Sequence, residues 1–264
     1  MSTDWLFAET PVVLIRAATG FPDALHPSEA DLFCRQAAMP RHRQDLLDTA
    51  HVVVVGCGGL GSWIALALAR MGVRALTLID PDRFDRTNAP RQIVLPADLG
   101  AFKAHAVAAN IEPHMTNRGA IRSIAQPFAE GLGLLDGSVQ GVVVSVDNNA
   151  TRLEASGWAR IHGIAAVFVM LSRDGLRAQS FRQDIDGPCL SCVLPDLDPQ
   201  VAAPCAAAAI TSCYLAASHG VQMLADAIMG GSLTPSWRET SLDGSTERIA
   251  RPTRRADCDA CARG

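Results

Sequence analysis

The chain has 264 residues, a net charge of −4 and an apolar fraction of 48%. This length fits one large domain, and the apolar residues suffice for a substantial core. The acidic balance and the lack of a basic stripe argue against nucleic acid as a partner. No uncharged apolar stretch reaches the roughly 18 residues that a membrane span needs. No signal peptide opens the chain, so we expect a cytoplasmic location.

The first 30 residues are the least informative part of the chain. The apolar stretch Pro11–Arg16 predicts an edge strand. We expect residues 1–30 to form an N-terminal arm. Arg35, which follows this arm, is interpreted from the residues alone as an exposed helical arginine.

A strand, a glycine loop, a helix, a second strand and an acid then follow one another. This is the layout of a nucleotide-binding βαβ unit. The glycines let the backbone approach phosphates closely, and the helix N-terminus offers them unpaired N–H groups. The acid can accept hydrogen bonds from ribose hydroxyls. The elements are Val52–Val55, the loop with Gly56, Gly58, Gly59, Leu60 and Gly61, residues 62–72, Ala75–Ile79 and Asp80.

Polar residues after the second strand favour ATP chemistry over hydride transfer. An enzyme that directs a nucleophile to the α-phosphate of ATP needs charged and polar side chains around the phosphates, here called the phosphate clamp. These side chains are needed because negative charge moves onto phosphate oxygens in the transition state. The alternative is an NAD-dependent oxidoreductase, for which the sequence shows no evident acid or base. The clamp residues are Asp82, Asn88, Arg91, Gln92 and Lys103.

Lys103 is the one lysine among 23 basic residues. A position that keeps lysine in an arginine-rich chain indicates a need for a compact ammonium group rather than a planar fork. Because Lys103 stands at a helix start, we predict a phosphate contact. The alternative is a solvated helix residue.

Strands and helices alternate beyond this point, which predicts an α/β fold with a Rossmann-like, mostly parallel, doubly wound sheet. The last of these strands is expected to be antiparallel. The expected elements are a helix at 102–111, strands at 120–124 and 141–146, a helix at 150–161, strands at 165–171 and 176–182, and a helix at 206–229.

Asp147 and Asn148 follow the strand at 141–146. Ligands of open α/β sheets bind outside the carboxyl ends of the strands, and a carboxylate there can hold Mg²⁺ against a triphosphate. The alternative is that Asp147 caps the next helix. Arg152, one turn into that helix, is either structural or close to the site.

Two C-x-x-C pairs stand 65 residues apart. Such pairs present four thiolates to one tetrahedral ion and predict a structural zinc site that ties the C-terminal tail to the middle of the chain. A disulfide and a thioredoxin-like redox motif are the alternatives. The four residues are Cys189, Cys192, Cys258 and Cys261.

Four further cysteines have no such pairing. Cys57 is expected to be a small loop residue, Cys213 a core residue on an apolar helix, and Cys34 carries no assignment. Cys205 follows a polar, proline-bearing loop and precedes the expected helix. A thiol at a helix N-terminus has a lowered pKa and is a usable nucleophile.

The ordered set of motifs resembles the ThiF/MoeB/HesA family, the bacterial relatives of ubiquitin-activating enzymes. The match extends over residues 32–261. It comprises G-x-G-G-L-G at Gly56–Gly61, D-x-D at Asp80 and Asp82, N-x-x-R-Q at Asn88, Arg91 and Gln92, then Lys103, Asp147 with Asn148, and both cysteine pairs.

The resemblance implies ATP-dependent adenylation of the C-terminal glycine of a small ubiquitin-like or sulfur-carrier protein. Residues 31–264 would form one adenylation domain, with a nucleotide-binding half at 31–175 and a carrier-binding half at 176–264 that adds antiparallel strands and zinc. ATP, Mg²⁺ and structural Zn²⁺ are the implied cofactors. A homodimer is implied, and a conjugating enzyme or sulfur donor is a candidate further partner.

The resemblance also implies roles for single residues. Arg91 and Lys103 would stabilise phosphate charge, together with Arg35 reaching the ATP of a dimer partner. Asp147 would hold Mg²⁺. Cys205 resembles the family cysteine that forms a covalent link with the activated protein, but alanines replace the family's glycine-containing text after it. Thioester formation therefore stays open, as does a non-catalytic adaptor that only binds a ubiquitin-like fold.

Overall fold

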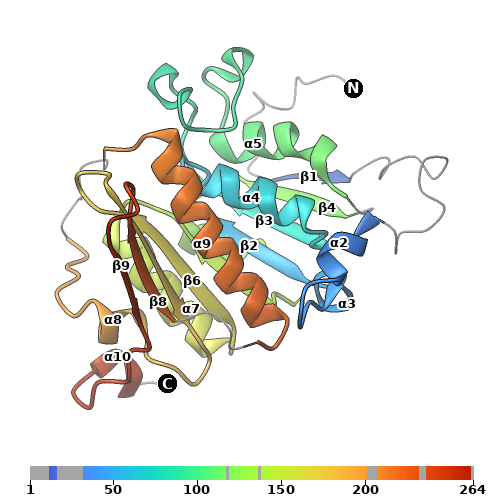
Figure 1. The fold of residues 1–264 in the computed structure, drawn as a ribbon. Coiled ribbons are helices and arrows are strands. Elements are labelled where there is room, and N and C mark those ends of the chain that lie inside the picture. Colours follow the sequence, from blue (N-terminus) through green and yellow to red (C-terminus); the bar gives the residue numbers. More distant parts are fainter. Residues whose placement is uncertain are drawn as a thin grey trace.

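The computed structural model describes residues 12–16, 32–116, 119–135, 138–200, 207–231 and 236–262. Within these residues one sheet of nine strands has the order β1-β4-β3-β2-β5-β6-β7-β8-β9 (Figure 1). The strands are β1 (Val12–Arg16), β2 (His51–Val55), β3 (Ala75–Ile79), β4 (Ala120–Ile124), β5 (Gly141–Val144), β6 (Ala165–Leu171), β7 (Arg177–Gln183), β8 (Trp237–Ser241) and β9 (Glu247–Ala250).

The central strands β4, β3, β2, β5 and β6 are parallel. At one edge β1 pairs antiparallel with β4, and at the other β7, β8 and β9 continue the sheet in antiparallel order. The predicted fold class is therefore confirmed, including the edge strand near the N-terminus and the antiparallel C-terminal extension.

Helices cover both faces of the sheet (Figure 1). One apolar core lies under α4, α5 and α9, and a second lies under α6, α7 and α8. The helices are α2 (Cys34–Ala37), α3 (Gln44–Leu47), α4 (Gly61–Arg70), α5 (Lys103–Ile111), α6 (Phe128–Leu132), α7 (Asn149–Ile161), α8 (Leu190–Val193), α9 (Ile210–Ile228) and α10 (Asp259–Ala262), with short 3-10 turns η2 (Arg86–Asn88), η3 (Pro96–Asp98) and η4 (Glu112–His114).

Strand β2 explains why its sequence is continuously apolar. Val52 and Val54 belong to the first core, whereas Val53 and Val55 belong to the second. A parallel strand covered on both faces needs apolar residues at every position rather than at alternate ones. The valine run therefore fixes β2 in the middle of the sheet.

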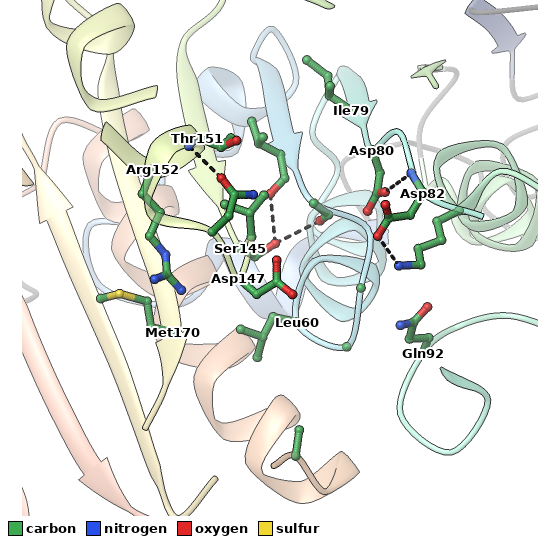
Figure 2. A pocket seen from close by; sticks show the side chains of 18 of the residues that line it. Leu60, Ile79, Asp80, Asp82, Gln92, Ser145, Asp147, Thr151, Arg152 and Met170 are labelled. Atoms are coloured by element: carbon green, nitrogen blue, oxygen red, sulfur yellow. Dashed lines mark hydrogen bonds and ion pairs between the residues drawn. The ribbon is translucent and has the colours of Figure 1, made fainter. Parts of the chain in front are cut away.

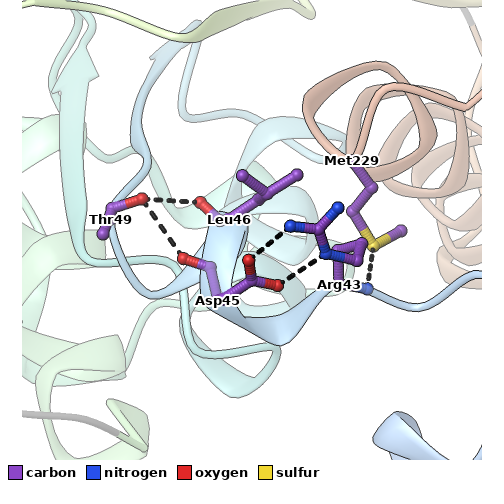
Figure 3. A network of polar contacts seen from close by, with 5 residues as sticks. All are labelled: Arg43, Asp45, Leu46, Thr49 and Met229. Atoms are coloured by element: carbon purple, nitrogen blue, oxygen red, sulfur yellow. Dashed lines mark hydrogen bonds and ion pairs between the residues drawn. The ribbon is translucent and has the colours of Figure 1, made fainter.

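The segment before β2 is anchored at the end of the sheet where β2 begins. The backbone N–H of Arg43 donates to Met229 Sδ, just after α9, at 3.2 Å, and Arg43 pairs with Asp45 at 2.6 Å (Figure 3). A Cβ on Gly72 would lie 2.5 Å from the Phe33 ring. Helices α2 and α3 therefore pack away from the carboxyl ends of the strands.

Several boundaries differ from the sequence-based expectations. The strand expected to run to Val146 ends at Val144, and beyond it the Ser145 hydroxyl donates to the carbonyl of Gly56 in the neighbouring loop. The helix expected over residues 62–72 ends at Arg70, before Gly72 with φ of +84°. The helix expected from residue 206 begins at Ile210. None of the described helices has the length and apolar composition needed to cross a membrane.

Candidate active site

A pocket of about 730 Å³ lies where β2, β3 and β5 end (Figure 2). Parallel α/β sheets bind ligands at this edge. The pocket brings together the motif residues that the sequence places far apart. These are Gly56, Gly58, Gly59, Leu60, Asp80, Asp82, Asn88, Arg91, Gln92, Lys103, Asp147 and Asn148.

The glycine loop needs two of its glycines for steric reasons. Gly56 has φ of +89°, which side chains rarely adopt. A Cβ on Gly61 would overlap the carbonyl oxygen of Gly56. This close approach lets α4 start directly after the loop, with Leu60 as its N-cap, so that the helix N-terminus faces the pocket.

Gly59 lies between α9 and the side chain of Arg91. A Cβ at this position would be 3.1 Å from Cys213 Sγ and 3.3 Å from Arg91 Cδ. Cys213 is 1% exposed, as expected of a core residue, yet it also lines the pocket. Burial raises the pKa of the Cys213 thiol, and Arg91 only partly opposes this, so Cys213 stays a neutral thiol at pH 7.

Asp80 braces the glycine loop from the end of β3. Its Oδ2 accepts from the backbone N–H of Cys57 at 2.6 Å, and its Oδ1 accepts from that of Asp82 at 2.8 Å. The side chain is buried, with 6% of the residue exposed. Burial raises the pKa of Asp80 to about 6, although Lys103 and the two N–H donors oppose the shift.

Lys103 is the first residue of α5 and pairs with Asp82. Its Nζ lies 2.7 Å from Asp82 Oδ2, and the two side chains are 13% and 65% exposed. Burial disfavours the ammonium charge, but Asp80, Asp82 and Asp147 more than compensate and raise the pKa of Lys103. The sole lysine is therefore a fixed cation in the pocket rather than a solvated helix residue.

The turn that carries Asn88, Arg91 and Gln92 is held by its own hydrogen bonds. Asn88 Oδ1 accepts from the backbone N–H of Asp85 at 3.1 Å, and the carbonyl of Asn88 accepts from Arg91 and Gln92. Trp63 Nε1 donates to the carbonyl of Arg91 at 2.9 Å. Gln92 Oε1 is buried and accepts no hydrogen bond in the described part of the chain.

Asp147 and Asn148 differ in their contacts, and this decides which of them caps α7. Asn148 is the N-cap of α7 and accepts from the backbone N–H of Thr151 at 2.8 Å. The alternative in which Asp147 caps this helix is therefore wrong. Asp147 is exposed and lines the pocket (Figure 2), where a carboxylate is a suitable ligand for a divalent cation.

Two proposed site residues in the described part of the chain, Gly61 and Arg35, do not line this pocket. Arg35 is exposed on α2, among the helices that precede β2, and does not line the pocket of its own chain. Cys205 lies outside the described residues. The expectation about its reactivity therefore stays a prediction.

The two cysteine pairs meet in one cluster that could hold zinc. The four sulfur atoms lie within 4.8 Å of one another. Cys189 Sγ is 3.5 Å from Cys258 Sγ, and Cys192 Sγ is 3.4 Å from Cys261 Sγ. These separations are too long for disulfide bonds, which are about 2.05 Å. Burial and the neighbouring thiols raise the pKa of Cys189 to about 12, so it is a thiol unless a cation is bound.

Sequence reasoning did not place three further pocket residues. Arg152 reaches the pocket from α7, Met170 from β6, and Arg173 from the turn after β6. The spacing of Arg152 from Asn148, one helical turn, was the available signal. No local pattern marks Met170 or Arg173, because only the pairing of β6 with β5 brings them to this edge.

The profile of the ThiF family matches residues 33–259. Mouse adenylyltransferase and sulfurtransferase MOCS3 is 30% identical over 251 residues, which are 90% of this chain and 54% of that protein. The chain thus spans about half the length of this relative. Sulfur carrier protein adenylyltransferase of Thermus thermophilus is 28% identical over 220 residues, 76% of this chain and 77% of that protein.

The structural comparison agrees with this assignment. Escherichia coli MccB, solved with AMPCPP and MccA, superposes with a TM-score of 0.72 over 88% of this chain and 74% of that one. The sequence identity is 18%. At this level the likeness establishes the fold.

Proposed function

The chain belongs to the ThiF family, and from this premise we propose that it adenylates the C-terminal glycine of a small ubiquitin-like or sulfur-carrier protein. The observation that carries the proposal is the convergence of the glycine loop, the Lys103–Asp82 pair and Asp147 in one pocket. Both relatives described above are named adenylyltransferases. The absence of an evident hydride-transfer group disfavours an NAD-dependent oxidoreductase, and the retained clamp disfavours a non-catalytic adaptor.

The pocket fits a nucleoside triphosphate. Its volume of about 730 Å³ is within the usual range for ligand sites. The glycine loop and the start of α4 form a cradle for phosphates. The unpartnered Gln92 Oε1 is suited to a ligand hydroxyl or amino group.

The clamp residues would stabilise the transfer of charge. A carboxylate oxygen of the carrier protein attacks the α-phosphorus, the bond to the bridging oxygen breaks, and pyrophosphate leaves with that electron pair. Lys103 and Arg91 would neutralise the phosphate oxygens as charge develops. Asp147 would hold Mg²⁺, which supplies further positive charge to the phosphates when bound.

The ribose contact is better served by Asp82 than by Asp80. Both oxygens of Asp80 already accept backbone hydrogen bonds, and the residue is buried. Asp82 is 65% exposed and shares only one oxygen with Lys103. We therefore assign Asp80 to positioning the loop and Asp82 to the sugar.

We propose a structural Zn²⁺ at the four cysteines. A Zn–S bond of about 2.3 Å in a tetrahedral site places sulfurs roughly 3.8 Å apart. Three of the sulfur–sulfur separations, 3.4, 3.5 and 3.8 Å, are equal to this edge or slightly shorter. The ion would join α10 and the tail to α8, as the sequence spacing predicted.

Arg35 could act on the nucleotide only across an interface between two copies, since it lies on α2 outside its own pocket. The proposal therefore includes a homodimer. It also includes a conjugating enzyme or sulfur donor as a further partner, and a cytoplasmic location. Sedimentation of wild type and Arg35→Ala tests the dimer, because loss of activity without loss of dimerisation is expected for a residue that only reaches the phosphates.

Pyrophosphate exchange tests the proposed reaction. The purified chain should incorporate labelled pyrophosphate into ATP only when a small protein with a C-terminal glycine is present. The products of neighbouring reading frames are the first proteins to assay. Exchange that persists without any carrier, or reduction of NAD in place of exchange, contradicts the proposal.

A further inference from the structure

Arg152 lines the pocket from the first turn of α7. The positive end of the helix dipole lies in this turn, so a cation here is unfavourable. No acidic residue occupies the turn to offset it. A helix with only a structural role would be more stable with a neutral or acidic residue at this position.

The guanidinium group is only partly satisfied. Arg152 Nη1 donates to Asn149 Oδ1 at 3.0 Å. Arg152 Nε is buried and has no hydrogen-bond partner among the described residues. Leaving a buried donor of a charged group unsatisfied is destabilising. Burial lowers the pKa of Arg152, and the charge of Asp147 opposes that shift.

Arg152 lies at the side of the pocket away from Asp82. Figure 2 shows Arg152 beside Met170 on one side of Asp147, with Asp80 and Asp82 on the other. Lys103 is fixed to Asp82 on that other side, and Arg91 and Arg173 also line the pocket. The side of Arg152 adjoins β6, from which the chain continues into the antiparallel strands.

We propose that Arg152 binds the terminal carboxylate of the carrier protein and holds it beside the α-phosphate, an inference that rests on the proposed function. With Nη1 held by Asn149, the edge formed by Nε and Nη2 matches a carboxylate in a bidentate contact. The attacking and leaving oxygens of phosphoryl transfer are roughly in line. The nucleophile therefore approaches from the side opposite the pyrophosphate, and Arg152 is a cation on that side if Lys103 holds the leaving group.

The test compares a free carboxylate with an amide. A short synthetic peptide ending in glycine is titrated into the chain saturated with AMPCPP, once as the free acid and once as the C-terminal amide. We expect wild type to prefer the acid by about tenfold or more, as for a charge-assisted bidentate contact. Arg152→Gln should remove this preference, and Arg152→Lys should keep only part of it.

Arg160→Gln is the matched control. Arg160 lies on the same helix, donates to the carbonyl of Gly187 at 3.3 Å and does not line the pocket. This variant should keep the full preference for the acid. AMPCPP affinity without peptide should change by less than about twofold in Arg152→Gln, a difference within ordinary binding error.

Four results would overturn the inference. Wild type that binds acid and amide alike, or an Arg152→Gln variant that keeps the preference, removes the carboxylate contact. A large loss of AMPCPP affinity in Arg152→Gln assigns the arginine to the nucleotide instead. A lowered melting temperature in Arg152→Gln identifies a structural role, because removal of an unfavourable cation should leave stability equal or higher.

Failure of the proposed function has a different signature. A wild type that does not bind AMPCPP, or that shows no exchange with any glycine-ended protein, contradicts adenylation itself. The acid and amide comparison reports on Arg152 alone, because it measures binding in the absence of chemistry.

Discussion

Lys103 Nζ and Asp82 Oδ2 are 2.7 Å apart, and this pair joins the start of α5 to the loop after β3. The backbone N–H of Lys103 also donates to the carbonyl of Asp82 at 2.8 Å. Side chain and main chain thus fix one cation against the wall of the pocket. A bound phosphate would compete with Asp82 for the same ammonium group, which is the geometry expected of a residue that exchanges partners on ligand binding.

Replacement of Lys103 by arginine should lower the adenylation rate at least roughly tenfold, about 1.4 kcal/mol. The pocket leaves the Lys103 side chain 13% exposed, and a planar fork needs more room than an ammonium group. Single-turnover formation of the adenylate measures the change. Arg70→Lys, at the exposed end of α4, serves as the control and should retain wild-type rates. Wild-type activity in Lys103→Arg would contradict a specific phosphate contact by the Lys103 ammonium group.

Removal of the metal should destabilise the tail without abolishing nucleotide binding. We expect a single zinc ion per chain in freshly reduced protein. Cys258→Ser should lose the ion and lower the melting temperature, since the cluster joins α10 to α8, two helices that are far apart in the sequence. AMPCPP affinity should stay close to that of wild type. Metal analysis that finds no zinc would contradict the site.

The sequence predicted the central fold because its strands carry complete local signals. Val52–Val55 is apolar at every position, as a strand buried on both faces requires. The resemblance implied antiparallel strands in the C-terminal half, but the residues of the β8–β9 hairpin were not located, because they are half-buried or exposed and show no apolar alternation. Position in the sheet, rather than composition, makes them strands.

The site was predictable as far as motif residues sit at strand ends. Asp147 and Lys103 were found because each directly follows a recognisable boundary. The position of Cys213 in the pocket wall depends on contact between α9 and the glycine loop, and no local pattern encodes such packing. The bracing role of Asp80 likewise depends on the N–H groups that its oxygens meet.

The titration of Asp80 should be displaced upward. Its pKa is raised to about 6, mainly by burial, from an ordinary value of about 3.9. A raised carboxyl pKa means that the fold favours the protonated form. Its contribution to stability is therefore complete below about pH 3.9 and is lost as the pH rises through about 6.

Carbon-13 NMR of the aspartate carboxyl groups measures this midpoint, with Asp80→Asn to assign the signal. Lys103→Met should raise the midpoint further, because the charge of Lys103 lowers the pKa of Asp80. A midpoint near 4 would show that solvent reaches the carboxyl group, and a midpoint that falls in Lys103→Met would contradict the effect assigned to the Lys103 charge.

Cys205 should be dispensable for attack on ATP. The phosphate clamp contains Lys103 and Arg91, and the chemistry at the α-phosphorus needs no thiol. Cys205→Ala should therefore leave pyrophosphate exchange within about twofold of wild type. If Cys205 accepts the acyl group, the same change should remove a thiol-sensitive adduct with the carrier on non-reducing gels.

Alanine variants of two other cysteines are the controls that distinguish acyl transfer to Cys205 from a reaction of any accessible thiol. Cys34 is exposed on α2, so Cys34→Ala should keep both exchange and adduct. Cys213 contacts Gly59, so Cys213→Ala should alter ATP affinity while keeping the adduct. An adduct that survives Cys205→Ala but vanishes with either control would move the covalent role to that residue. If wild type forms no adduct with the carrier, the reaction stops at the adenylate and Cys205 has no covalent role.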